Sequence, residues 1–192
     1  MLSALAGPDD AIVIDRLSHA SLVDAARATR ARLRVAAHHD PEAVAAALSR
    51  HQPARRRFVV TEGVFSMEGD LAPLAQLLDV TESHEAILVV DDAHGAFVLG
   101  RTGRGTPEAC GADPARFILI GTLGKALGCQ GGFVVGPKPL IELIRNRAKT
   151  FIYTTALATP VAAAAVAALG VVEQEPVHRE RLRARVEALH RE

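Results

Sequence analysis

One lysine lies in a glycine-rich stretch, where its amine could bind a phosphate or form a covalent bond. Lys125 sits in the sequence GTLGKALG, which follows a short apolar run. A phosphate-binding P-loop needs the pattern GxxxxGK[ST]. In that alignment Leu119 occupies the position of the first glycine, and Ala126 occupies the position of the metal-binding hydroxyl. The pattern fails at both ends, which disfavours a nucleotide-binding loop.

A lysine that forms an imine with a carbonyl compound needs an amine at a strand end and flexible backbone around it. Gly121, Gly124 and Gly128 would let a flat cofactor approach the backbone closely. Thr122 offers a hydroxyl to a phosphate. These residues favour pyridoxal phosphate as the partner of Lys125, with a glycine-rich turn carrying a surface lysine as the plain alternative.

Pyridoxal phosphate also requires a carboxylate that keeps its ring nitrogen protonated. Asp91 and Asp92 end an apolar run, and His94 follows in the sequence DDAHG. Because neighbouring strand residues point to opposite faces, only one of the two aspartates can face the ring. They could instead be turn formers before a glycine, or metal ligands together with His94.

A second polar group, His38-His39-Asp40, could also suggest metal binding. Adjacent residues on a strand point to opposite faces, and the sequence shows no further His, Asp or Glu cluster with convincing ligand spacing. We therefore predict that this group is a solvated loop start and that the chain holds no metal.

Buried strands and helices alternate along the chain. Apolar runs rich in Val and Ile predict strands, at 11–15, 32–37, 57–62, 86–91, 116–121 and 131–136. Helical patterns lie between or after them, at 20–31, 41–51, 72–84, 137–149 and 159–190, the last interrupted near Glu175–Pro176. Asp40 and Pro41 suit the start of the second helix. This alternation predicts an α/β fold with a mostly parallel sheet.

In open parallel sheets, ligands bind at the carboxyl ends of the strands. Four predicted strands are followed by polar sequences, namely DRLSHAS, TEGVFSMEGD, DDAHG and GTLGKALG. Four such sequences from different strands favour one shared site over unrelated turns.

Composition limits the classes of partner. The 192 residues include 22 Lys+Arg and 22 Asp+Glu, so the net charge is zero and neither nucleic acid nor an anionic membrane surface is indicated. Two cysteines form no disulfide framework. The sequence shows no signal peptide and no convincing apolar span. We expect a cytoplasmic protein that does not bind membranes.

Five sequence blocks together resemble the α-oxoamine synthase family. They occur in the family's order over most of residues 1–165 and are DRLSHASLVDA, VVTEGVFSMEGDLAPL, VVDDAHGAFVLGRTGRGT, GTLGKALG and FIYTTAL. The family consists of fold-type I pyridoxal-phosphate enzymes that join an amino acid to an acyl thioester with loss of CO₂. The resemblance implies the large domain of a fold-type I transferase, with a mostly parallel sheet flanked by helices.

The resemblance also assigns roles to single residues. It implies that Lys125 attaches to the cofactor and moves protons, that Asp91 holds the pyridine nitrogen, and that His19 stacks on the ring. We count these three as catalytic residues. Further implied cofactor contacts are His94 near the phenolic oxygen, Ala93 on the other ring face, Ser66 and Thr122 as polar contacts, and Thr154 or Thr155 reaching a phosphate across a dimer interface.

For substrates, the resemblance implies L-alanine or glycine and an acyl thioester of coenzyme A or acyl carrier protein, handled by a homodimer. The blocks TEGVFSMEGDLAPL and FIYTTAL favour the branch that joins L-alanine to a pimeloyl thioester in biotin synthesis. GTLGKALG is equally typical of a branch that acetylates glycine. An alternative of another class is a non-catalytic subunit that pairs with a complete protomer.

The family's outer portions have no counterpart in this sequence. Family members carry a segment before the LSALAGPDD region and a C-terminal domain that holds the substrate carboxylate. We therefore expect residues 1–172 to be the central part of the cofactor-binding domain, incomplete at both ends. Residues 173–192 are expected to begin the helix that leads to an absent domain, which makes the activity of this chain alone doubtful.

Overall fold

The computed structural model describes residues 1–50 and 53–191, and within them six strands form one sheet. The strands are β1 Ala11–Asp15, β2 Arg32–Ala36, β3 Arg57–Glu62, β4 Ala86–Asp91, β5 Ile118–Thr122 and β6 Gly132–Val135. Each lies where the apolar runs predicted it, with ends that differ by at most two residues. Their order across the sheet is β2-β1-β3-β4-β5-β6.

The first five strands are parallel, and only β6 is antiparallel, to β5. The predicted mostly parallel sheet is thus confirmed. Because the parallel strands share a direction, the residues that follow them gather at one edge of the sheet, which we call the carboxyl edge.

The helices agree with the predicted pattern, with additional short ones. They are α1 Leu2–Leu5, α2 Ala20–Ala28, α3 Pro41–Ser49, α4 Leu74–Ser83, α5 Thr106–Cys110, the 3₁₀ helix Pro114–Arg116, α6 Lys138–Arg147, α7 Lys149–Ile152, α8 Thr159–Gln174 and α9 Val177–Leu189. The helix expected at 41–51 ends at Ser49, and residue 51 lies outside the described residues. Asp40 caps α3 by accepting a 2.8 Å hydrogen bond from the Ala43 N–H, as the sequence predicts.

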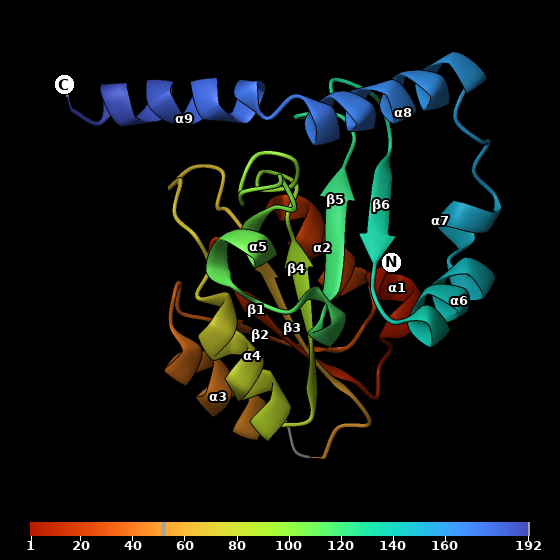
Figure 1. Ribbon diagram of the computed structural model, residues 1–192. Helices are drawn as coiled ribbons and strands as arrows, with labels where there is room; N and C mark the ends of the chain where they lie inside the picture. Colours follow the sequence, from red (N-terminus) through yellow and green to blue (C-terminus); the bar gives the residue numbers. More distant parts are fainter. Residues whose placement is uncertain (51–52, 192) are drawn as a thin grey trace.

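Helices flank both faces of the sheet (Figure 1). Two apolar layers lie between these helices and the sheet. Val13, on one face of β1, packs with residues of α3 and α4. Ile12 and Ile14, on the other face, pack with residues of α1, α2 and α6. This alternation follows from the two-residue period of a strand. The result is a three-layer fold, with the sheet between two layers of helices.

The last two helices run along the carboxyl edge, and α9 extends past the body of the molecule (Figure 1). The helical pattern breaks between Gln174 and Val177, as the sequence Glu175–Pro176 predicts. The Arg183 guanidinium donates to the Gly100 carbonyl and fixes part of α9 near the β4–β5 connection. Among the described residues, no helix is long and apolar enough to cross a membrane.

Candidate active site

The central strands bring three polar residues to the carboxyl edge. Glu62 ends β3, Asp91 ends β4 and Thr122 ends β5. Glu62 and Asp91 are partners in the parallel pairing of β3 and β4, and Asp91 pairs with Ile120 of β5. The loops after β4 and β5 carry His94 and Lys125. We call Glu62, Asp91, His94 and Lys125 the lysine cluster.

Lys125 reaches His94 across the gap between those two loops. Its Nζ lies 2.6 Å from His94 Nε2. A protonated amine donates to an imidazole nitrogen only if that nitrogen carries a lone pair, so the contact requires neutral His94 with its proton on Nδ1. Burial lowers the pKa of His94, and the positive charge of Lys125 lowers it further. The geometry and the electrostatics therefore agree on a neutral His94.

The loop that carries Lys125 is held by short-range bonds. Thr122 Oγ1 accepts a bond from the Gly124 N–H at 3.1 Å and donates to the Gly131 carbonyl at 3.2 Å. The loop then turns back through a 3.0 Å bond from the Gly128 N–H to the Lys125 carbonyl. Gly128 has φ +62°, which an L side chain rarely adopts. These bonds leave the Lys125 side chain exposed at the edge of the sheet.

The adjacent aspartates occupy different environments. Asp92 is fully buried, and its carboxylate accepts bonds from Thr106 Oγ1 at 2.5 Å and the Thr106 N–H at 3.0 Å. Burial raises the pKa of Asp92 to about 6. A Cβ at Gly63, Gly95 or Gly105 would lie within 2.4 Å of its oxygens, so these glycines make room for the carboxylate.

Asp91 faces away from that buried pocket. It is half-buried, and within the described residues its carboxylate accepts one hydrogen bond, at Oδ1 from the Ala93 N–H at 3.0 Å. Its negative charge adds to the raised pKa of Glu62 and offsets part of the lowering of the His94 pKa, so it lies close to both residues. The structure thus separates the two aspartates as strand alternation predicts.

Glu62 is a member of the cluster that the sequence reasoning missed. It is buried, and its Oε1 accepts a 2.5 Å bond from the His19 N–H. Burial raises the pKa of Glu62, and the charge of Asp91 adds to the effect. The pairing of a strand-end acid with Asp91 in the next strand is the feature that could have identified it.

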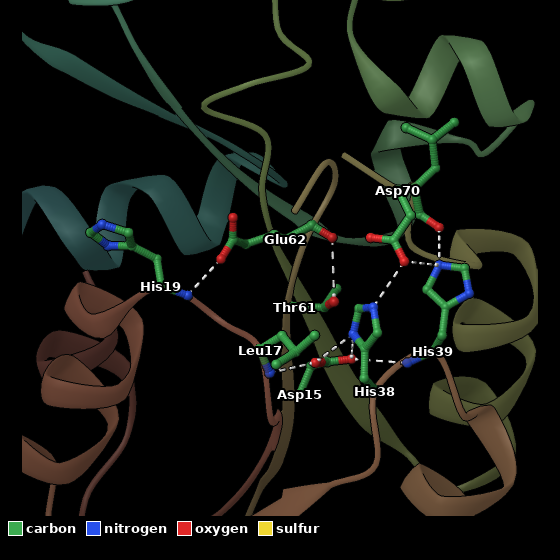
Figure 2. A network of polar contacts seen from close by, with 9 residues as sticks. Asp15, Leu17, His19, His38, His39, Thr61, Glu62 and Asp70 are labelled. Atoms are coloured by element: carbon green, nitrogen blue, oxygen red, sulfur yellow. Dashed lines mark hydrogen bonds and ion pairs between the residues drawn. The ribbon is translucent and has the colours of Figure 1, made fainter. Parts of the chain in front are cut away.

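His19 caps α2 and lies at the same edge (Figure 2). Its Nδ1 accepts a 3.2 Å bond from the Ser21 N–H, and the exposed ring is close enough to affect the pKa of His94. Ala93 is half-buried beside Asp91, and Ser66 is exposed in the loop after β3. The fold brings His19 and Ala93 to the cluster, whereas Ser66 makes no polar contact with its described members.

The two threonines near the end of the chain lie apart from these residues. Thr154 and Thr155 are exposed in the segment between α7 and α8, and Thr154 Oγ1 donates to the Thr150 carbonyl. Among the described residues, neither forms a hydrogen bond with a member of the lysine cluster.

The metal-binding alternative for Asp91, Asp92 and His94 does not match the structure. The Asp92 carboxylate points into its buried pocket and is occupied by Thr106. In the described part of the chain, the donor atoms of these three residues do not converge on one point.

The prediction of a solvated loop start at His38-His39-Asp40 was wrong for His38. The His38 side chain is 18% exposed and lies between Asp15 and Asp70 (Figure 2). His38 and His39 lie in a turn after β2, and His39 has φ +60°, so strand alternation does not separate their side chains. Donor atoms of His38, His39 and Asp70 lie within 4.8 Å of one another. Because carboxylates already engage both ring nitrogens of His38, we interpret this group as a hydrogen-bonded cluster.

Comparisons with known proteins agree with this geometry. The chain is 51% identical over 187 residues to the 8-amino-7-oxononanoate synthase of Methylococcus capsulatus, covering 97% of this chain and 48% of that protein. It is 47% identical over 191 residues to the enzyme of the same name from Aromatoleum aromaticum, covering 100% and 49%. The chain therefore spans about half the length of the curated relatives it matches.

Solved structures show the same fold. A serine palmitoyltransferase from S. paucimobilis, solved with a bound PLP–myriocin aldimine, superposes with a TM-score of 0.93 at 34% identity, covering 98% of this chain and 49% of that one. The 8-amino-7-oxononanoate synthase of Francisella tularensis superposes with a TM-score of 0.81 at 31% identity, covering 94% and 52%. These matches confirm the fold-type I architecture.

The family comparison covers every residue of the sequence. Residues 1–192 match the family described as aminotransferase class I and II. By this match over its whole length, the chain belongs to the aminotransferase class I and II family.

Proposed function

We propose that the lysine cluster binds pyridoxal phosphate through Lys125. We further propose that the whole protein condenses L-alanine with a pimeloyl thioester, releasing CO₂ and forming 8-amino-7-oxononanoate. The observation that carries the proposal is the 2.6 Å contact between Lys125 and His94, at the edge where Asp91 and Glu62 also end their strands. The names of the relatives at about 50% identity support this choice of substrates.

The residues present fit this cofactor. An exposed primary amine suits a carbonyl carbon, and the half-buried Asp91 has an oxygen that accepts no bond from the described residues. A protonated pyridine nitrogen is the kind of donor that such an oxygen would bind. Thr122 and Ser66 offer hydroxyls, and His94 and His19 offer imidazoles. Bound pyridoxal phosphate supplies an electron sink for an amino acid's α-carbon.

Each candidate residue has a role that its position supports. Lys125 Nζ would hold the cofactor, and the same amine would take the proton from the substrate α-carbon and later return one. Asp91 holds the ring nitrogen protonated. Neutral His94 can donate from Nδ1 and accept at Nε2, which suits a contact with the phenolic oxygen.

The remaining candidates would surround the cofactor. The exposed ring of His19 is placed to stack on one face of the pyridine, with Ala93 on the other. Ser66 and Thr122 would contribute polar contacts. Thr154 and Thr155, exposed between α7 and α8, would complete a phosphate site in a homodimer.

The reaction then balances as follows. The α-carbon of L-alanine loses a proton to Lys125 and forms a carbon–carbon bond with the thioester carbonyl carbon, which expels the thiolate, and the thiolate takes a proton from water. The β-keto acid loses CO₂, and a proton returned by Lys125 completes the amino ketone. We also propose that residues 173–192 lead toward a further domain and that the enzyme works in the cytoplasm.

Covalent labelling tests the attachment residue. The sequence has three lysines, Lys125, Lys138 and Lys149, so the other two serve as internal controls. After incubation with pyridoxal phosphate and reduction with borohydride, peptide mass mapping should place a phosphopyridoxyl group on Lys125. Labelling should persist in Lys138→Arg and Lys149→Arg and disappear in Lys125→Arg. Equal labelling of all three lysines would contradict the proposal.

The substrates are tested separately. Incubating the loaded protein with L-alanine in D₂O, with proton NMR of the α-position, measures proton transfer without the thioester. Adding pimeloyl-CoA and assaying for 8-amino-7-oxononanoate tests the full reaction. We expect exchange at the α-carbon of L-alanine. For the 192-residue chain alone we expect little product, because efficient condensation needs both reactants held in place. Exchange of glycine but not L-alanine would reject the proposed amino acid.

A further inference from the structure

His38 lies between two carboxylates (Figure 2). It follows the edge strand β2, and three strands separate β2 from β5, which precedes Lys125. Its Nδ1 is 3.0 Å from Asp15 Oδ1, and its Nε2 is 2.9 Å from Asp70 Oδ2. An imidazole can donate to both carboxylates only when it carries both protons. We call Asp15, His38 and Asp70 the histidine clamp.

The surroundings of the ring favour the charged form. The side chains of His38 and Asp15 are 18% and 12% exposed, so solvent screens this pair only partly. The edge of the His38 ring meets Phe65, with centroids 4.5 Å apart and planes at 87°. Burial alone would lower the pKa of His38, but the hydrogen bonds to Asp70 and Asp15 outweigh it and raise the pKa.

The clamp joins two loops that carry candidate site residues. Asp15 Oδ1 also accepts a 2.9 Å bond from the Leu17 N–H, which fixes the start of the loop that leads to His19. Asp70 closes the loop that contains Ser66, because its carbonyl accepts a 3.0 Å bond from the Phe65 N–H. A single side chain from a third element, the loop after β2, thus ties both loops together.

We propose that His38, held as a cation between Asp15 and Asp70, is a positioning residue that fixes the His19 and Ser66 loops at the cofactor site. The inference rests on the proposed function, because it takes His19 and Ser66 to be cofactor contacts. His38 itself touches neither Lys125 nor Asp91 among its described contacts, so it acts only through the loops.

The clamp should make the order of both loops depend on pH. The charged groups that face His38 are Asp15 from β1 and Asp70 from the loop after β3, and the ring of His39 lies 5.1 Å away. The pKa of His38 is raised in the folded protein, so the stabilisation is complete below the usual pKa of about 6.5 and is lost as the pH rises through the raised value.

Hydrogen exchange tests this directly on the full chain. We expect wild-type peptides covering 15–19 and 63–72 to be more protected at pH 6 than at pH 8.5, after correction for intrinsic exchange rates. His38→Gln should lose that protection at pH 6 and show no such pH dependence. Asp70→Asn, which keeps the Asp15–His38 pair, provides a milder second variant. His178→Gln, on α9, removes a histidine that forms an exposed pair with Glu175; it is the matched control and should match the wild type.

Pyridoxal-phosphate affinity provides the second readout. At pH 6.5, His38→Gln should weaken binding about three- to tenfold, the size of one or two lost hydrogen bonds, and the difference should shrink at pH 8.5. Exchange and affinity profiles in His38→Gln that match the wild type would overturn the inference. So would a zinc-induced rise in the unfolding temperature that is lost in His39→Ala, since that result would make the cluster a metal site.

The two readouts also separate this inference from the proposed function. If the cofactor fails to attach to Lys125 but the exchange differences appear, the proposed function fails and the pH-dependent tie between the loops stands. If attachment is normal and the exchange of the two loops is unaffected by His38→Gln, only the clamp is rejected.

Discussion

The lysine cluster and the histidine clamp lie on the same edge of one sheet, yet their polar groups are satisfied to different degrees. In the clamp, both ring nitrogens of His38 face a carboxylate within 3.0 Å. In the lysine cluster, two basic groups, Lys125 and His94, face one another at 2.6 Å, and two acidic groups, Glu62 and Asp91, end adjacent strands.

Glu62 and Asp91 are like charges at the ends of adjacent strands, and such pairs cost stability and are concentrated at functional sites. The pKa shifts express the same contrast. Attractive partners raise the pKa of His38 against the effect of burial, whereas burial and Lys125 together lower the pKa of His94. In the clamp, the charged partners attract one another, whereas the lysine cluster places two acids on adjacent strands and keeps His94 neutral beside Lys125. Substitutions in the lysine cluster should therefore mainly lower activity, whereas substitutions in the clamp should mainly lower stability.

The largest expected effect comes from Lys125→Met. Removing the amine should lower deuterium exchange at the α-carbon of L-alanine by at least about 10³-fold, because the group that moves the proton is gone. Lys125 is exposed, so the urea unfolding free energy should stay within about 0.5 kcal/mol of the wild type.

His38→Gln is the matching substitution in the clamp, and it should lower the unfolding free energy at pH 6 by about 1–2 kcal/mol. Suppose instead that Lys125→Met lowers the unfolding free energy by a similar amount and retains deuterium exchange at the α-carbon of L-alanine. That result would contradict the view that the lysine cluster serves activity and the clamp serves stability.

Asp91→Asn should have the next largest effect. A neutral amide stabilises a protonated pyridine nitrogen much less than a carboxylate does, so exchange at the α-carbon should fall about 100-fold while the cofactor stays attached to Lys125. NMR exchange rates and the absorbance of the attached cofactor measure the two properties separately. Wild-type exchange in this variant would show that the carboxylate has been misassigned.

Asp92→Asn is the matched control, since it removes a carboxylate from the buried side of the same strand end. Asp92→Asn should change the rate of deuterium exchange at the α-carbon of L-alanine by less than about threefold. Burial raises the pKa of Asp92 to about 6, so ionisation of the folded protein costs stability as the pH rises from 4 through 6. That part of the pH dependence, at most about 3 kcal/mol, should be absent in Asp92→Asn.

Most of the fold follows from local patterns in the sequence. The runs that became β1, β3 and β4 are apolar on both faces, as strands covered by helices must be. The short helices α1, α5 and α7 span only four or five residues, too few for a helical period to show. Their positions depend on tertiary packing.

The site was predictable to the extent that parallel strands align their ends. This rule placed Asp91, His94 and Lys125 together, and strand alternation separated Asp91 from Asp92. It could not reveal the clamp, because His38 meets partners 23 and 32 residues away in sequence and His39 adopts a positive φ. Such long-range contacts depend on the path of the loops, which no local pattern specifies.

The smallest expected effect comes from Glu62→Gln and tests whether the acids of the lysine cluster repel one another. The pKa of Glu62 is raised, by burial and then by Asp91, so its ionisation costs stability as the pH rises through the raised value. The amide oxygen can still accept the His19 N–H bond. At pH 7.5 the variant should therefore be more stable than the wild type, by a few tenths to about 1 kcal/mol. At pH 4, where the wild-type side chain is mostly protonated, the variant and the wild type should be equally stable.

Urea unfolding at both pH values measures these stabilities. Glu68→Gln, which changes an exposed acid in the loop after β3, is the control and should leave the stability unchanged at both pH values. If Glu62→Gln were less stable than the wild type at pH 7.5, attractive partners would stabilise ionised Glu62, as they stabilise charged His38. Glu62 would then resemble the clamp, and the proposed repulsion between Glu62 and Asp91 would be rejected.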